Sequence, residues 1–256
     1  MIRLKTKEEI AILKEGGARL AFIVETLAKA LRAGVSTLEI DTLAEHLTRD
    51  GGDIPSLKNY KPKGANTPYP ATICISINDE VVHGIPKGTR IIKEGDVVGL
   101  DMSITHKGLV TDMATTVAVG TVDKKSLDLM RATKEALFAG IEKAKIGNTI
   151  GDIGAAIEAS IKPHGYGIVR ELAGHGVGFG VHEEPMVPNF GKKGKGETLR
   201  EGMVIAIEPM INEGAAGVRF LSDGYTVITK DGSRSAHFEH TVAIVADGPV
   251  ILTELG

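Results

Sequence analysis

The spacing of apolar positions divides the chain into helical and extended stretches. Between residues 7 and 32, apolar residues recur about every 3.6 positions, which predicts a long amphipathic helix with one buried face. The residues that carry this pattern are Ile10, Leu13, Leu20, Ile23, Val24, Leu27 and Leu31. A second helix is predicted over 37–50, because Ser36 or Thr37 can cap its start and two glycines can end it.

Beyond the second helix, a polar stretch containing prolines predicts an irregular loop over 53–70. The β-branched segment ATICISI, residues 71–77, is typical of a strand. The rest of the chain is predicted to contain a β-hairpin, then two helices near 123–145 and 149–162, then strands near 202–212, 216–229 and 237–246.

The order of two helices followed by strands occurs twice, and a sequence similarity accompanies it. EGDVVGLDMSI (94–104) aligns with EGMVIAIEPMI (201–211), which places Asp101 over Glu208. A second pair of segments, each entering a helix after glycine, matches in the same way. The similarity suggests that one α+β unit is duplicated, with a carboxylate on the corresponding strand of each copy.

Length and composition fit a globular protein. The 256 residues can form a large core, as one big domain or two small ones. The internal similarity favours a single α+β domain over 1–256, with pseudo-repeat halves at about 7–120 and 121–250.

Charge and cysteine content exclude several classes of protein. A net charge of −3 and a pI near 6.3 provide no overall attraction to nucleic acid or membrane. One cysteine, Cys74, excludes an internal disulfide framework and fits a reducing compartment. The N-terminal segment has no secretory signal pattern, and no apolar run reaches the length of a membrane span. We therefore expect a cytoplasmic protein that acts as a monomer.

Two aspartates occupy the predicted hairpin, in GDVVGLDMSITHKGLVTDMATT. A strand over 97–105 that turns at 106–107 and returns over 108–117 would pair residues whose numbers add up to 213. Asp101 and Asp112 satisfy this condition, so we expect them opposite each other on one face, with Cβ atoms about 5 Å apart. Because two bare carboxylates at that distance repel each other, the pattern predicts a divalent cation between them.

Two histidines lie in the glycine-rich segment AGHGVGFGVHEEP, residues 173–185. The alternating glycines disfavour a helix and allow the backbone to approach a ligand, so His175 and His182 are candidate functional groups. A glycine-rich loop with two incidental histidines is the alternative. Met186 stands where an HExxH motif needs its second histidine, which excludes a thermolysin-like zinc helix. The glycine pattern also does not support dinucleotide binding.

Two glutamates interrupt apolar segments, Glu208 in MVIAIEPM and Glu239 in SAHFEHTVAIV. A carboxylate inside a buried strand is costly unless it is paired or binds a metal; surface carboxylates on edge strands are the alternative. Together with Asp101, Asp112 and His175, these glutamates make a candidate oxygen-rich site. Manganese, iron, cobalt and zinc all tolerate such a site.

Six segments together resemble the signature segments of type I methionine aminopeptidases. They are CISINDEVVHGIP, GDVVGLDMSI, LVTDMATT, GHGVGFGVHEEP, IEPM and HFEHT. The resemblance runs from about residue 5 to residue 254. It implies the pita-bread fold, in which pseudo-twofold halves share a central antiparallel sheet flanked by helices. It also implies removal of the N-terminal methionine from nascent polypeptides.

The resemblance implies a metal centre with two divalent cations, of cobalt, manganese, iron or zinc. In such a centre Asp112 and Glu239 would bridge the two metals. Asp101 would bind one of them, and His175 and Glu208 would complete the other.

The resemblance also implies catalytic and substrate-binding roles. Glu208 would relay the proton of the attacking water, His182 would stabilise the oxyanion, and His83 would donate toward the leaving nitrogen. Val181 stands where the family commonly has a larger aromatic residue, and the loop over 58–68 departs from the pocket loop of the family, so we expect a preference for methionine with some cleavage after leucine or norleucine. The residues that match positions of the substrate pocket are Tyr69, Cys74 and Tyr225.

Two other functions share parts of this pattern. An Xaa-Pro aminopeptidase or prolidase has the same metal site, but those enzymes usually carry an extra N-terminal domain, for which the chain has no room before residue 70. A non-enzymatic pita-bread binding protein would typically have lost ligands, whereas all five are present here. A basic loop could make a transient contact with the ribosome or could simply be solvated; its lysines are Lys192, Lys193 and Lys195.

Overall fold

The computed structural model describes residues 2–62 and 64–255, and within them the four predicted helices are confirmed with small differences at their ends. They are α1 (Lys7–Ala30), α2 (Thr37–Asp50), α3 (Lys124–Ile141) and α4 (Ile150–Ile161), the last followed by a 3-10 turn at Lys162–His164. Thr6 and Ser36 form capping boxes with Glu9 and Glu39, which fix where α1 and α2 begin. None of the helices in these residues is long and apolar enough to cross a membrane.

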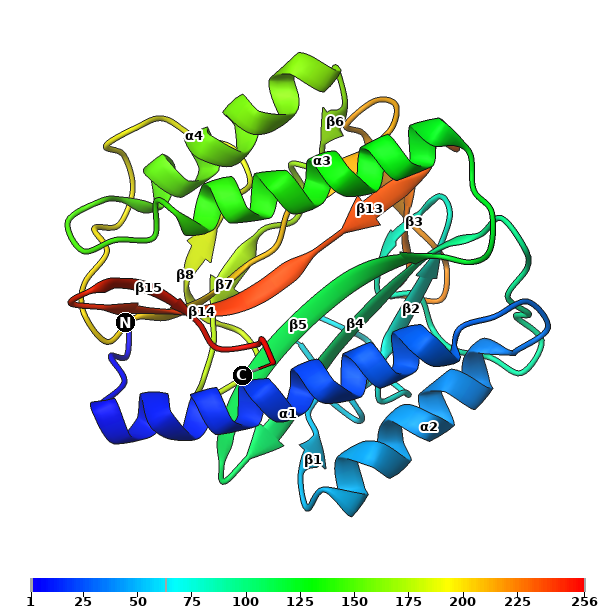
Figure 1. Ribbon diagram of the computed structural model, residues 1–256, viewed down its shortest axis with the longest axis horizontal. Helices are drawn as coiled ribbons and strands as arrows, with labels where there is room; N and C mark the ends of the chain where they lie inside the picture. Colours follow the sequence, from blue (N-terminus) through cyan, green and yellow to red (C-terminus); the bar gives the residue numbers. More distant parts are fainter. Residues whose placement is uncertain (1, 63, 256) are drawn as a thin grey trace.

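Nine strands form one antiparallel sheet with β5 and β14 at its centre (Figure 1). The strands follow the order β1-β4-β5-β14-β9-β7-β8, while β2 pairs with β4 and β15 pairs with β14. Their bounds are β1 Ile54–Pro55, β2 Cys74–Ile77, β4 Val97–His106, β5 Leu109–Ala118, β7 Gly174–Gly176, β8 Glu183–Val187, β9 Val204–Ile207, β14 Glu239–Val245 and β15 Gly248–Ile251.

The arrangement of helices and strands repeats on the two sides of the β5–β14 pairing. The first helix pair precedes β4 and β5, and α1 lies along these two strands (Figure 1). The second helix pair precedes β9 and β14, and α3 contacts both. The boundaries of the two halves, 7–120 and 121–250, stay a prediction.

Two three-stranded sheets contain the remaining strands. One has the order β13-β10-β6 and the other the order β11-β12-β3. The predicted strand near 202–212 is divided into β9 and β10, because Pro209 has no N–H to continue a ladder. The predicted strand near 216–229 is also two strands. The bounds are β3 Glu80–Val82, β6 Gly167–Ile168, β10 Met210–Asn212, β11 Val218–Phe220, β12 Val227–Thr229 and β13 Ser235–His237.

Side chains alternate between the two faces of the main sheet, and the apolar ones pack under the helices. Leu100 and Met102 of β4 belong to one buried cluster with Leu27 of α1. Ile207 of β9 belongs to a second buried cluster with Ile157 of α4. Because successive residues of a strand point to opposite faces, the aspartate between Leu100 and Met102 faces away from the helices.

The hairpin of β4 and β5 has a different register from the predicted one. Its turn is Lys107-Gly108, both with positive φ (+48° and +84°), as a two-residue hairpin turn requires. Asp101 therefore pairs with Ala114, and Asp112 pairs with Ser103. The predicted direct opposition was wrong, because the partner of each aspartate lies two residues away from the predicted one. The two aspartates are diagonal neighbours, but they still share a face because the shift preserves the alternation.

The segment before β2 is anchored by a buried carboxylate on α2. Oδ1 of Asp41 accepts hydrogen bonds from the backbone N–H groups of Thr72 (2.8 Å) and Ile73 (3.2 Å). We expect Asp41→Ala to lower the free energy of unfolding by about 1–3 kcal/mol, because it leaves buried donors without a partner. Urea denaturation measures this loss. Asp41→Asn, which keeps an acceptor, should lose less, and Asp50→Ala on the exposed face of α2 should lose almost nothing.

Candidate metal centre and substrate cavity

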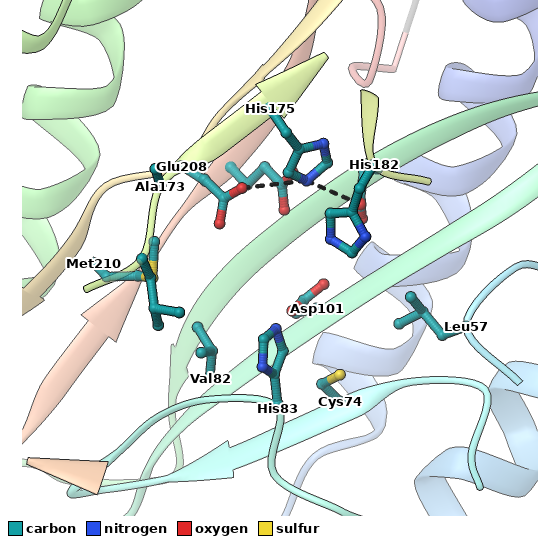
Figure 2. Close-up of a pocket in the computed structure, with 13 residues that line it drawn as sticks. Leu57, Cys74, Val82, His83, Asp101, Ala173, His175, His182, Glu208 and Met210 are labelled. Atoms are coloured by element: carbon teal, nitrogen blue, oxygen red, sulfur yellow. Dashed lines mark ion pairs between the residues drawn. The ribbon is translucent and has the colours of Figure 1, made fainter. Parts of the chain in front are cut away.

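The face of the main sheet opposite the helices borders a cavity of about 140 Å³ (Figure 2). In Figure 2, His175, His182, Glu208, Asp101 and His83 point toward a common centre. The cavity is lined by all five predicted metal ligands and by both predicted catalytic histidines. Its full lining is Leu57, Cys74, Val82, His83, Asp101, Asp112, Leu172, Ala173, His175, His182, Glu208, Met210 and Glu239.

Three neighbouring strands supply the acidic floor of the cavity. Asp101 lies on β4, Asp112 on β5, and Glu239 is the first residue of β14. The backbone N–H of Asp112 donates to Oγ1 of Thr241 (2.9 Å), and the Thr241 hydroxyl donates to the Asp112 carbonyl (2.7 Å). These bonds hold β5 against β14, so the two halves of the chain meet at the carboxylates.

His175 on β7 presents one nitrogen to this acidic floor. Its Nδ1 donates to the carbonyl of Gly176 (3.0 Å), which leaves Nε2 as the nitrogen with a free lone pair. Nε2 lies 3.4 Å from Oε1 of Glu208 and 4.0 Å from Oδ2 of Asp112. Donor atoms of Asp112, His175 and Glu239 all lie within 4.8 Å of one another. The tautomer of His175 with its proton on Nδ1 is the one that can bind a metal through Nε2.

Glu208 reaches the cavity from the break between β9 and β10. The side-chain amide of Asn189 donates to the backbone carbonyl of Glu208 (2.9 Å), which stabilises the irregular backbone at this break. On its other side, Oε2 of Glu208 lies 3.5 Å from Nε2 of the buried His237. No functional role was assigned to His237 from the sequence.

Without a cation among them, burial and mutual repulsion disfavour the ionised forms of these carboxyl groups. Burial, reinforced by Asp112, raises the pKa of Asp101 to about 8, and burial raises that of Glu208 to about 8. Burial and the same neighbours raise the pKa of Glu239 well above its usual range. Oε1 of Glu239 is buried without a hydrogen-bond partner among the described residues. A divalent cation would balance this charge and give Oε1 a partner, so these residues fit a metal.

His83 and His182 stand at the rim of the acidic group. Burial, with His237 and His175 nearby, lowers the pKa of His83 to about 4. His182 reaches solvent at the mouth of the cavity. The protein atoms packed around its ring nevertheless desolvate it and lower its pKa, as do His175 and His83. Both imidazoles are therefore neutral near pH 7 and can donate a hydrogen bond to a substrate.

A buried ion pair fixes the loop that carries His182. Lys5, before α1, contacts Oε2 of Glu183 at 2.9 Å, and both side chains are largely buried. Oε1 of Glu183 accepts the backbone N–H groups of Gly180 (2.8 Å) and Phe179. The N-terminal segment thus helps to hold the residue next to His182.

A second, mostly apolar cavity of about 270 Å³ adjoins the first. The two share Leu57, Cys74, His83 and His182, so they form one continuous site. All three predicted pocket residues line the second cavity. The rings of Tyr69 and Tyr225 meet edge to face with centroids 5.1 Å apart, and Cys74 is buried beside them.

Leu57, Tyr60 and His237 are among the residues of the site that had no role in the sequence pattern. Leu57 and Tyr60 belong to the loop predicted over 53–70, which showed no motif. His237 lies in SAHFEHT, two residues before Glu239. Alternation along a strand could have placed it on the same face as Glu239.

The comparisons with known proteins agree with this geometry. The model of metallopeptidase family M24 matches residues 11–246. The chain belongs to this family. The matched range includes every residue that lines the acidic cavity, from Leu57 to Glu239.

Within the M24 family, methionine aminopeptidases match the chain over its whole length. That of Aquifex aeolicus is 46% identical and that of Clostridium acetobutylicum 43% identical, each with 99% of both chains covered. The crystal structure of the Thermotoga maritima methionine aminopeptidase has a TM-score of 0.95 at 38% identity and covers 99% of this chain and 100% of that one. The resemblance noted in the sequence and the pita-bread fold that it implied are confirmed.

Prolidases of the family match less completely. The prolidase of Pyrococcus furiosus has a TM-score of 0.76 at 26% identity, and the alignment covers 98% of this chain but only 65% of that one. The chain thus corresponds to about two thirds of that prolidase.

Proposed function

We propose that this protein is a metal-dependent methionine aminopeptidase that removes the initiating residue from nascent polypeptides. The observation that carries the proposal is the joining of a five-donor acidic centre to an apolar cavity through His83 and His182. The full-length similarity to proteins named methionine aminopeptidase supports it. A basic loop containing Lys192 and Lys193 is exposed and could touch the ribosome transiently.

The proposed metal centre holds two divalent cations. Asp112 and Glu239, from the two central strands, would bridge them; Asp101 would bind one, and His175 with Glu208 would complete the other. When bound, such a pair of cations polarises the peptide carbonyl and makes hydroxide available near neutral pH. The donor set does not select among manganese, iron, cobalt and zinc.

The chain's own groups would position the substrate and move protons. Glu208, whose carboxylate lines the acidic centre, would take and relay a proton of the attacking water. The neutral imidazole of His182 can donate to the developing oxyanion, and that of His83 can donate toward the leaving nitrogen. The apolar cavity beside Tyr69, Cys74 and Tyr225 would take the first side chain.

A comparison of three peptides tests the function. With added manganese or cobalt, we expect Met-Ala-Ser to be cleaved fastest. Leu-Ala-Ser should be cleaved more slowly by about 10- to 200-fold, because small differences between apolar side chains are worth about 1–3 kcal/mol. Ala-Pro should not be cleaved, and a chelator should stop all turnover. Initial rates of peptide release measure these differences.

Each alternative function predicts another result in this assay. Faster cleavage of Ala-Pro than of Met-Ala-Ser would indicate a prolidase-like peptidase, which the partial structural match would then explain. No cleavage of any of the three peptides by metal-loaded protein would indicate a binding protein instead.

A further inference from the structure

Tyr60 contacts a catalytic histidine, although it lies outside the sequence motifs that carry the site residues. Its hydroxyl oxygen lies 2.9 Å from Nδ1 of His182. The two rings are 5.4 Å apart between centroids and inclined by 40°. Tyr60 also lines the apolar cavity together with His182, so the contact lies where a substrate would enter.

The backbone holds Tyr60 against the wall of the apolar cavity. The Tyr60 N–H donates to the carbonyl of Leu57 (2.9 Å), and the Tyr60 carbonyl accepts the N–H of Tyr69 (2.8 Å). The N–H of Asn59 donates in turn to the carbonyl of Tyr69 (2.8 Å). Tyr69 is 3% exposed, and its hydroxyl bonds the carbonyls of Ile73 and Gly84. The backbone at Tyr60 is therefore held to the buried Tyr69, which limits where the phenol ring can lie.

The chemistry of the pair selects one tautomer of His182. A neutral imidazole carries one N–H, on either Nδ1 or Nε2. If the phenol donates to Nδ1, the imidazole proton must be on Nε2, the nitrogen farther from the backbone. The reverse direction, with Nδ1 donating to the phenol oxygen, is the weaker one, because a phenol O–H is a better donor than a neutral imidazole N–H and an imidazole nitrogen is a better acceptor than a phenol oxygen.

The ring of His182 is also restrained from the other side. Its centroid lies 4.4 Å from that of His175, with the rings inclined by 66°. His175 is itself fixed by its bond to the Gly176 carbonyl. Because Tyr60 occupies Nδ1 and His175 packs against the ring, Nε2 of His182 is the nitrogen that can donate a hydrogen bond to the substrate.

We propose that Tyr60 is a positioning residue, whose hydroxyl donates to Nδ1 of His182 and so keeps the donating N–H on Nε2, where it stabilises the oxyanion of the peptidase reaction. The proposal rests on the proposed function for the reaction that it serves. The hydrogen bond and the tautomer can be tested without turnover.

The kinetic test is Tyr60→Phe, which removes only the hydroxyl. We expect kcat to fall by about 10- to 100-fold, by analogy with the loss of the hydrogen-bond partner that orients a metal-binding histidine. KM for Met-Ala-Ser and the metal content should stay at the wild-type values. Tyr166→Phe is the matched control, because Tyr166 stacks on His164 away from both cavities and should leave kcat unchanged. A kcat within twofold of wild type for Tyr60→Phe would overturn the proposal.

A double-mutant cycle separates positioning from direct action. If Tyr60 acts through His182, adding Tyr60→Phe to His182→Ala should cause no further loss of kcat. An equal loss from Tyr60→Phe in both backgrounds would overturn the proposal, since Tyr60 would then act on its own.

The spectroscopic test does not depend on activity. In zinc-loaded protein, the ¹⁵N resonances of the His182 ring, assigned with His182→Ala, should show the proton on Nε2. In Tyr60→Phe they should shift toward a mixture of tautomers. An unchanged tautomer in Tyr60→Phe would overturn the proposal even if the peptidase assay succeeded. A changed tautomer would support it even if the substrate proved to be another peptide class.

Discussion

Glu239→Gln is expected to abolish peptidase activity and, at the same time, to stabilise the metal-free protein. The glutamine cannot bridge two cations, so we expect metal binding to weaken by more than the 10- to 100-fold seen when residues behind the ligands are changed. Without metal, burial and the acidic neighbours oppose ionisation of Glu239, which costs stability near neutral pH, and the change removes this cost. Thermal denaturation with and without added metal, together with metal analysis, measures both effects.

The stability effect should reverse when metal is added. Saturating metal stabilises only a protein that binds it, by about 2.7 kcal/mol when the free concentration is 100 times the Kd. Wild type should therefore be the less stable protein in chelator and the more stable one in metal. Glu25→Gln, an exposed change on α1, is the control and should show no reversal. Full activity and metal content in Glu239→Gln would contradict the proposed bridge.

The same repulsion makes the metal-free protein sensitive to pH. The pKa values of Asp101 and Glu208 are raised to about 8 in the folded protein from their ordinary values of 3.8 and 4.5. The folded state therefore holds protons that the unfolded state releases, and stability falls as pH rises from about 4 toward 8. Glu239→Gln should flatten this dependence, because it removes a carboxyl group that takes part in the repulsion.

Alanine substitutions of the two histidines in the glycine-rich segment should affect different properties, kcat for His182 and metal content for His175. His182→Ala should lower kcat by about 100- to 1,000-fold, the cost of losing one oxyanion donor, with metal content near that of wild type. His175→Ala should lose metal first, because its Nε2 lies among the carboxylates. Kinetics and metal analysis on the same preparations separate these outcomes.

His164→Ala provides the control for both changes, since His164 stacks on Tyr166 outside the two cavities. It should retain both kcat and metal. A metal-depleted His182→Ala together with a fully loaded His175→Ala would mean that the roles of the two histidines are exchanged.

The helices and the grouping of the candidate ligands could be predicted because they depend on short-range rules. Apolar periodicity and caps such as Ser36 define α1 and α2 locally. Alternation along a strand decides which face a side chain occupies. The wrong register of the β4–β5 hairpin therefore still left Asp101 and Asp112 on one face. The error arose because Lys107, with φ +48°, occupies the first turn position without a sequence signal.

Contacts between distant segments could not be predicted in this way. Tyr60 and His182 are 122 residues apart, and neither belongs to a pattern that includes the other. His237 meets Glu208 because β13 pairs with β10, a short pairing that follows the break at Pro209. Pairings of two or three residues have too little periodicity to be read from sequence.

The hydrogen bonds that join Asp112 to Thr241 span 129 residues, and this separation has a consequence for how the protein is made. Closing so large a loop is entropically costly, so such contacts form late in folding. During synthesis, α1 through β5 can emerge and pack before β14 exists. The acidic centre is therefore completed only when the last strands dock, and until then the growing chain can neither bind metal in full nor act on other chains.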